Sequence, residues 1–564
     1  MSQHSAFDLR ILCVLLACRL VPAPVSAQSL TIPTALSGQP PAGVSVRQLT
    51  VDDAVRLALE QNLNIQVERF NPLISDLSIA QARTAWTPAV STTLTTTGRD
   101  SPANSFLSGA QDKLTNGQFS TGVTFGQAFP WGGSTALSWD SSRSTSNNVF
   151  SSFNPTLQSN LAFQYVQPLL RNFKIDSARQ QLLVTRKNRE ISDVDLRQTV
   201  VSTVRNVKNT YWDLAYSLAS VAVQEQSLEL ARQSARDTRS RVEIGTMAPI
   251  DIVAADAEVA AREEAVIVAE GAIDQAQDRL RSLILDPRTP DFWNVRFELT
   301  DVAPLQVQLI NLDAAVQNAL SIRTDLQQAR KTLESNDIQL LYARNQTLPD
   351  VNLEVNYGLT GLGGRQFLFG QGFPPNIIGQ IDRGFGSVLG DLFANNFPNW
   401  SLAVRLGYPI GFTPAEANLA RARLQYTQSQ TQIRNLELQV TTQVRDAARQ
   451  VNTNAKRVET TRAARELNER RLEAEQKKFT AGTSTSFFVF QAQRDLSQAR
   501  NNELQATLDY NKSLVDFETV QETSLGGGSG SVTVLTSGST AAGASGTGTA
   551  TTTTPSAQGA QGPP

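Results

Sequence analysis

Apolar residues recur at alternating spacings of four and three along a run, 169–244, that contains neither glycine nor proline. Such a heptad pattern is typical of a helix that packs lengthwise against other helices. As one helix the run would be about 110 Å long. A second run without these residues, 415–481, has its own heptad pattern and would reach about 100 Å. The apolar positions are Val200, Val204, Val207, Tyr211, Leu214, Leu218 and Val221 in the first run, and Val444, Ala448, Val451, Ala455 and Val458 in the second.

Shorter segments alternate apolar and polar residues, as strands with two different faces do. We expect strands at about 90–97, 119–142, 160–167, 351–357 and 400–407. The segment 119–142 contains a turn at Pro130–Gly133 and is expected to form a hairpin. Whether that hairpin enlarges a sheet or lies outside it stays open at this point.

The chain repeats itself. Asp52 and Asp313, and Pro88 and Pro349, are 261 residues apart, and two Gly-Thr pairs beginning at Gly245 and Gly482 are 237 apart. We therefore divide the chain into two repeats, 49–290 and 310–525. Each is predicted to run helix, strands, long helix, Gly-Thr turn, return helix.

The two ends of the chain differ from this core. Residues 1–27 resemble a secretory signal peptide cleaved after Ala27, although Cys18 also fits a lipidation site. Residues 28–48 are expected to form an extended leader. Residues 526–564 are Gly, Ser, Thr, Ala and Pro almost exclusively, which predicts a disordered tail.

Composition excludes several kinds of chemistry. The only histidine is His4, and the only cysteines are Cys13 and Cys18, all within the leading 18 residues. The exported chain therefore has no histidine-based catalytic site and no His/Cys metal site, and we expect no enzyme activity and no cofactor. A net charge of −2 without basic clusters does not suggest nucleic acid as a partner.

Two-faced strands suit either a half-buried sheet or a barrel wall between lipid and water. A few strands cannot close a barrel alone, so several copies would have to share one. The predicted fold class is mostly α, with a coiled-coil helical tunnel and a transmembrane β-barrel shared between copies. The alternative is a cell-surface or periplasmic coiled-coil stalk that has no pore.

The repeated helix starts at Leu49–Leu59 and Ile310–Leu320 resemble those of the TolC family of outer-membrane efflux and secretion channels. The Gln167-Pro168 and Tyr408-Pro409 junctions and the two Gly-Thr turns are similar as well. The resemblance covers about 49–525. It implies a homotrimer in the outer membrane of a Gram-negative-type bacterium, with its helices in the periplasm. Four strands per chain would give a twelve-stranded barrel, joined through a periplasmic adaptor to an inner-membrane transporter.

The resemblance also implies that the helix turns at the tunnel tip meet the adaptor. In this chain they are Ile244, Gly245 and Thr246 in the first repeat, and Ala481, Gly482 and Thr483 in the second. Glycine suits a helix reversal because it tolerates positive φ. The alternative is that these glycines only make turns.

For the periplasmic gate the resemblance singles out Asp251, Ser484, Phe488 and Gln491. Asp251 keeps a carboxylate, but Ser484 stands where an arginine partner is expected, and Phe488 and Gln491 where an acidic ring is expected. Phe487, Phe488 and Phe490 cluster there instead, so we expect a constriction that closes by apolar packing and dewetting. The alternative is that these rings only pack the coiled coil.

Overall fold

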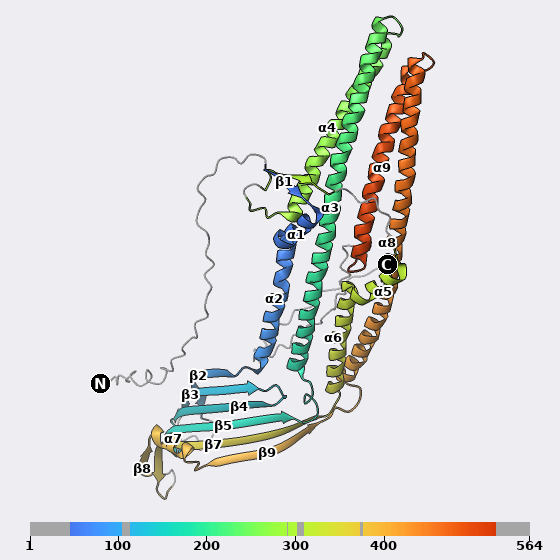
Figure 1. Ribbon diagram of the computed structural model, residues 1–564. Helices are drawn as coiled ribbons and strands as arrows, with labels where there is room; N and C mark the ends of the chain where they lie inside the picture. The colour runs from blue at the N-terminus through green and yellow to red at the C-terminus, as the bar shows by residue number, and fades with distance from the viewer. Residues whose placement is uncertain (1–44, 104–112, 290–291, 302–309, 373–375, 526–564) are drawn as a thin grey trace, which may run out of the picture.

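The computed structural model describes residues 45–525 except 104–112, 290–291, 302–309 and 373–375. The predicted signal peptide, Cys18 and the predicted tail lie outside the described residues. Figure 1 shows two long helical hairpins at one end of the molecule and a broad sheet at the other.

The two repeats have matching helices. The first contains α1 (Val51–Gln61), α2 (Leu63–Arg83), α3 (Ser177–Glu243) and α4 (Ile250–Ile284). The second contains α5 (Leu312–Ile322), α6 (Thr324–Gln346), α8 (Pro414–Thr480) and α9 (Ser486–Val520). α3 and α8 have 67 residues each, and α4 and α9 have 35 each. A short 3-10 turn, η1 (Thr84–Trp86), follows α2.

Two helix boundaries differ from the sequence prediction. The long helix of the first repeat starts at Ser177 rather than at 169, because the Asp176 carboxylate accepts a hydrogen bond from the Arg179 amide and caps the helix there. The first helix of the repeat, which the sequence starts at Leu49–Leu59, is interrupted at Asn62, whose side chain accepts from the amides of Asn64 and Ile65 and starts α2. The absence of glycine and proline permits a helix but does not start one.

The helices form a layer four helices wide. Next to the sheet the order is α2, α3, α6, α8, and toward the tips it is α4, α3, α9, α8. Near the middle, Tyr211 and Leu214 of α3 pack with Leu280 of α4 in the largest buried cluster. The parallel strands β1 (Ser45–Leu49) and β6 (Val295–Leu299) close this cluster, so the end of the predicted leader is a paired strand.

The main sheet has six long strands. In spatial order they are β2 (Ala89–Pro102), β3 (Lys113–Ala128), β4 (Ser134–Ser146), β5 (Phe153–Pro168), β7 (Asp350–Phe369) and β9 (Pro398–Gly407). The predicted hairpin is β3–β4, and it lies within the sheet between β2 and β5. The chain therefore contributes six strands and not the four implied by the resemblance.

A small outer element extends the distal half of β7. There β8 (Ile377–Arg383) pairs with β7 from Gly364 onward, while β9 pairs with its first half. The helix α7 (Phe385–Phe393) bridges β8 and β9, and its Val388 is buried against Gly361 and Gly363 of β7. A side chain at either glycine would collide with Val388, so the close approach of α7 depends on them.

Candidate functional site: a two-faced sheet and a helical tip

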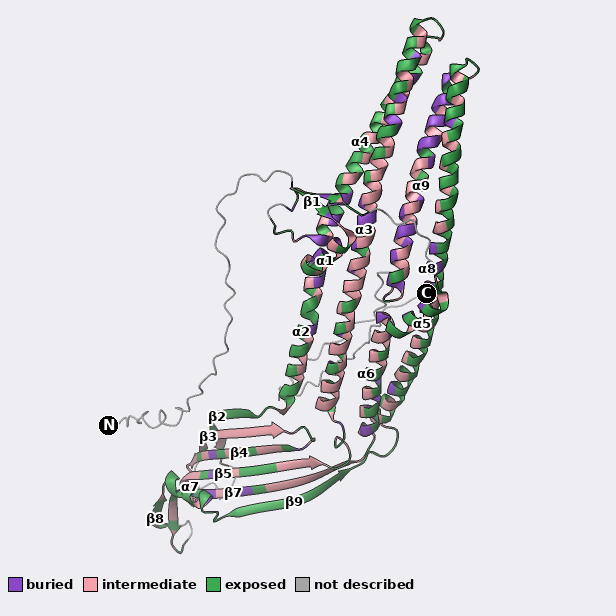
Figure 2. Cartoon of the chain, in the orientation of Figure 1, coloured by how far each residue is buried: buried purple, intermediate pink, exposed green. Residues whose placement is uncertain are grey.

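One face of the main sheet is apolar across all six strands. A row of paired residues runs through it from edge to edge, and the neighbouring rows on this face add Leu94, Val123, Trp139, Leu161, Val355 and Leu402. The row consists of Val90, Phe125, Leu137, Phe163, Tyr357 and Trp400. Seven of these twelve side chains are exposed and five are intermediate. Figure 2 shows the edge strands β2 and β9 largely exposed and β3 largely intermediate.

The opposite face carries hydroxyl and amide groups, for example Thr93, Ser138, Asn160 and Asn356. Its charged side chains on β7 and β9 are paired, because Arg405 lies 3.1 Å from the Glu354 carboxylate. A sheet with one apolar and one polar face suits a wall between lipid and water. None of the described helices is long and apolar enough to cross a membrane.

The two tip turns have the same backbone. Gly245 has φ +84° and Gly482 φ +75°, in the left-handed region that favours glycine. The Thr246 amide donates to Arg241 O and the Thr483 amide to Lys478 O, each at 2.9 Å. The hydroxyl of each threonine donates to the same carbonyl oxygen. Ile244, Ala481 and both Gly-Thr pairs are exposed at the ends of the hairpins.

The predicted gate residues are near the tips, but they do not form one cluster within the chain. The Asp251 carboxylate accepts from the Ala248 amide at 3.2 Å, within the turn that leads into its own helix. The Ser484 hydroxyl donates to Glu475 at 2.9 Å. The hydrogen bond from Lys478 and, to a smaller extent, this bond from Ser484 lower the pKa of Glu475. Gln491 donates to Asp495 and accepts from Arg494.

The expected phenylalanine cluster is only partly present. Phe487 and Phe488 are exposed and meet edge to face, with ring centroids 5.6 Å apart. Phe490 is buried, because two positions along α9 turn its side chain toward the packed side of the helix. The burial of Phe490 agrees with the alternative that this ring packs the coiled coil.

The structure adds polar contacts between the two hairpins that the sequence analysis missed. Arg494 of α9 pairs with Glu258 of α4 at 2.9 Å, and the Glu258 side chain is largely buried. The Arg241 guanidinium lies 4.3 Å above the Phe479 ring and donates to Phe479 O, which joins the end of α3 to α8. Because Glu258 and Arg494 are 236 positions apart, no local motif indicates their pairing.

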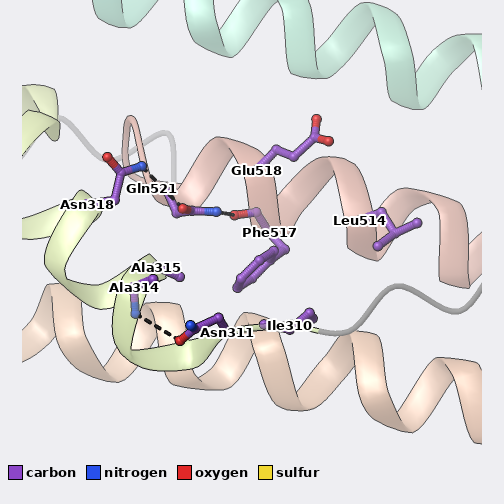
Figure 3. Close-up of a pocket in the computed structure, with 9 residues that line it drawn as sticks. All are labelled: Ile310, Asn311, Ala314, Ala315, Asn318, Leu514, Phe517, Glu518 and Gln521. Carbon is purple, nitrogen blue, oxygen red and sulfur yellow. Dashed lines mark hydrogen bonds between the residues drawn. The ribbon is translucent and has the colours of Figure 1, made fainter.

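A shallow cleft lies between α5 and α9 (Figure 3). Asn318 donates to Gln521 at 3.3 Å across it, and Asn311 accepts from the Ala314 amide. Its only carboxylate, Glu518, pairs with Lys208 of α3. In the described part of the chain, no cluster of three or more His, Cys, Asp or Glu side chains could hold a metal ion.

Comparisons with known proteins agree with this architecture. Residues 134–284 and 315–520 match the outer membrane efflux protein family. No curated protein sequence matches the chain. Three solved structures share the fold over 84% of this chain: CusC (TM-score 0.61, 15% identity, 92% of its chain), the CmeC outer membrane channel of Campylobacter jejuni (0.58, 13%, 85%) and the MtrE outer membrane channel of Neisseria gonorrhoeae in its open state (0.56, 16%, 89%).

Proposed function

We propose that three copies of this chain assemble into one passive duct. The premise is that the chain belongs to the outer membrane efflux protein family and is an outer-membrane efflux channel. Its helical part stands in the periplasm. There it would receive cargo from an inner-membrane transporter through a periplasmic adaptor. The resemblance to the TolC family is confirmed by the family match, and the comparisons do not support the alternative of a stalk without a pore.

The observation that carries the proposal is that both layers of the molecule end on the same two sides. Among the described strands, β2 pairs only with β3, and β9 pairs only with β7. β8 also pairs with β7, beyond the part of β7 that β9 covers. The helical layer ends with α2 and α4 on the side of the molecule where β2 lies, and with α8 on the side where β9 lies (Figure 1). An open sheet edge is not tolerated in lipid, so further copies have to cover both edges.

The internal repeat indicates which helices meet between copies. Within the chain, α3 of the first repeat packs on α6 of the second. In the internal repeat α8 corresponds to α3, and α2 corresponds to α6. The equivalent of the α3–α6 contact would therefore join α8 of one copy to α2 of the next. Both helices are lateral edges of the layer, as this contact requires.

The residues at the equivalent positions support this contact. At the internal joint Lys187 of α3 pairs with Glu334 of α6 at 2.8 Å, and Lys331 with Glu190 at 2.7 Å. Three of the four equivalent edge positions are apolar, because Leu424 replaces Lys187, Phe70 replaces Lys331 and Leu73 replaces Glu334, and the fourth is Thr427, which replaces Glu190. Leu424 is 72% exposed and Phe70 61% exposed in the single chain. Burying them between copies would be favourable.

We assign the tip turns to adaptor docking and the region just behind them to the gate. The exposed turns Ile244–Thr246 and Ala481–Thr483 are the farthest part of the helices from the sheet (Figure 1). Asp251, Ser484, Phe487, Phe488 and Gln491 surround the entrance, with Phe487 and Phe488 as its apolar constriction. Arg494–Glu258 and Arg241–Phe479 hold the two hairpins together, so opening would separate these pairs.

The test uses purified full-length protein in planar bilayers, with its mass measured in the same detergent. A trimer that conducts ions, and that conducts more after Phe488→Asp, agrees with the proposal. An acidic ring at the constriction should also make the conductance sensitive to divalent cations. A monomer, or a particle that does not conduct, would contradict the duct. Conductance that is unchanged by Phe488→Asp would remove Phe488 from the pore lining.

A further inference from the structure

We propose that the membrane barrel of the assembled protein has eighteen strands, six from each chain, and is about as wide as the helical tunnel below it. This inference rests on the proposed trimer and goes beyond it, because the same trimer could enclose a narrower wall if the β3–β4 hairpin lay outside the barrel. Three features of the chain place the hairpin in the wall.

The first feature is that the hairpin completes both faces of the sheet. β3 pairs with the whole length of β2, from Ala89 opposite Gly126 to Pro102 opposite Lys113. β4 pairs with β5 from Ser134 opposite Val166 to Ser144 opposite Thr156. Val123, Phe125, Leu137 and Trp139 lie on the apolar face, in the same rows as residues of β2 and β5. A hairpin outside the barrel wall would not require apolar residues aligned in the same rows as those of β2 and β5.

The second feature is the stagger of the strands. Ala89, at the start of β2, lies in a row of paired residues that crosses all six strands. On the side of this row that faces the helices, each strand has as many residues as the preceding strand or more. From β2 to β9, five strands further on, the increase is six residues, which corresponds to a strand tilt of about 40°, within the range of closed barrels. The hairpin strands follow this progression. The extensions are two residues in β3 (126 to 128) and β4 (136 to 134), four in β5 (164 to 168), and six in β7 (356 to 350) and β9 (401 to 407).

The third feature is the width of the two layers. Six strands spaced 4.8 Å apart and tilted by 40° cover about 37 Å of circumference. Four packed helices cover roughly 32–40 Å, so the two layers match, whereas four strands would cover only about 25 Å. In a trimer the barrel would be about 36 Å across at the backbone with eighteen strands and about 24 Å with twelve. With eighteen strands, the membrane section would add no second constriction above the tunnel for bulky cargo.

A deletion variant tests the width. Removing residues 113–152 leaves 103–112 to connect β2 to β5, and the faces stay in phase because Val90, Phe125, Leu137 and Phe163 share one row. We expect trimers of both proteins. In electron micrographs of detergent-solubilised particles, the barrel of the variant should be narrower by about one third. Trimers with an equally narrow barrel in both proteins would overturn the eighteen-strand inference and leave the duct intact. An intact protein that is not trimeric would instead contradict the proposed function.

Cysteine pairs in the full-length chain give a second measurement that does not depend on the deletion folding. Thr92, Val123, Trp139 and Leu161 share one row. With the hairpin in the wall, the double variants Thr92→Cys/Val123→Cys and Trp139→Cys/Leu161→Cys should form disulfides within a chain. Thr92→Cys/Leu161→Cys should not, because three strand spacings, about 14 Å, separate these positions. Peptide mapping reads the result, and a disulfide in the last variant alone would overturn the inference.

Discussion

In the first repeat α1 meets α2 at Asn62, whereas in the second repeat α5 meets α6 at Arg323, which occupies the equivalent position 261 residues later. The Asn62 amide donates to Leu283 O at 2.9 Å, and the Arg323 guanidinium donates to Val520 O at 3.2 Å. These two acceptors are also equivalent, at the 237-residue offset of the return helices. The repeats have therefore kept the same joint while its side chain changed from a neutral amide to a buried cation.

The two side chains need different numbers of hydrogen-bond partners. Arg323 is 1% exposed and needs Asp325 and Gln443 in addition to Val520 O. Asn62 needs only Leu283 O and the two amides that it caps. The comparison shows that a duplicated backbone position can be satisfied by different polar chemistry, provided that every buried partner is matched.

The largest expected effect is a difference in stability loss between substitutions at the two joints. Arg323→Ala removes a buried cation and leaves Val520 O, Gln443 and the partly exposed Asp325 carboxylate without their donor, which should destabilise the chain by about 3–5 kcal/mol. Asn62→Ala removes a helix cap and one hydrogen bond and should cost about 1–2 kcal/mol. Thermal unfolding of the purified proteins, compared at one scan rate, measures the difference. Equal losses would contradict the asymmetry of the two joints.

The next prediction concerns the apolar edges that replace the charged internal joint. Phe70→Asp or Leu424→Asp should weaken association by roughly 10–100-fold, since each side chain would otherwise gain about 1.5–3 kcal/mol on burial. Mass measurement over a dilution series reports the loss. A trimer that survives dilution as the wild type does would show that these edges do not meet.

A matched variant sharpens the same comparison. The combination Leu424→Lys, Thr427→Glu, Phe70→Lys and Leu73→Glu copies the internal joint onto the edges. It should restore association relative to the single Asp variants, because opposite charges then face one another as they do between α3 and α6. Failure of this rescue would show that the two contacts are not equivalent.

The tip glycines are expected to behave alike in the two repeats. Gly245→Ala and Gly482→Ala should each destabilise the tip by about 1–2 kcal/mol, since an added Cβ would meet no atom within 4 Å and only the positive φ opposes it. Gly271→Ala is the control. Gly271 lies inside α4 with equally open space and ordinary φ, and alanine there should stabilise by about 0.5–1 kcal/mol. Amide hydrogen exchange, measured at the tips for the first two variants and along α4 around position 271 for the control, separates the three outcomes.

Much of this architecture could be predicted from periodicity. The heptads, the alternating strands and the two Gly-Thr turns are local signals, and the repeat offsets relate them to one another. The position of the β3–β4 hairpin could not be predicted, because alternation marks a strand but does not identify its neighbour. The break at Asn62 was missed because its cap lies within a helix-favouring sequence. The buried side of Phe490 and the Arg494–Glu258 pair depend on how α9 lies against helices of the other repeat.

The Arg494–Glu258 pair gives a gating prediction of moderate size. Its partners come from different repeats, so it tests whether the hairpins move apart. Arg494→Ala should raise the open population roughly five-fold, since a partly exposed pair contributes about 1 kcal/mol. Single-channel recordings measure the open probability, and Arg471→Ala is the control because its partner Asp495 lies within the same hairpin. An effect of Arg471→Ala as large as that of Arg494→Ala would contradict a specific role for the inter-hairpin pair.

The smallest effect is a pH dependence confined to the charged internal joint. Lys331 lowers the pKa of Glu190, and Lys187 lowers that of Glu334, below the ordinary value of 4.5. Their partners raise the pKa values of Lys187 and Lys331 above 10.5. The stabilisation by these two ion pairs is therefore complete between the ordinary carboxyl value of 4.5 and the ordinary amine value of 10.5. It is lost as the pH falls through the lowered carboxyl values or rises through the raised amine values.

We expect Glu190→Gln and Glu334→Gln to lower thermal stability by a few tenths to about 1 kcal/mol at pH 7, because all four side chains are partly exposed. This difference from the wild type should shrink as the pH falls below 4.5 through the lowered pKa values, because the carboxylates then become protonated and lose their ion pairs. The apolar edges have no such dependence. The four-residue variant that copies the charged joint onto them should therefore form a trimer that dissociates in acid, whereas the wild-type contact between α8 and α2 should not weaken.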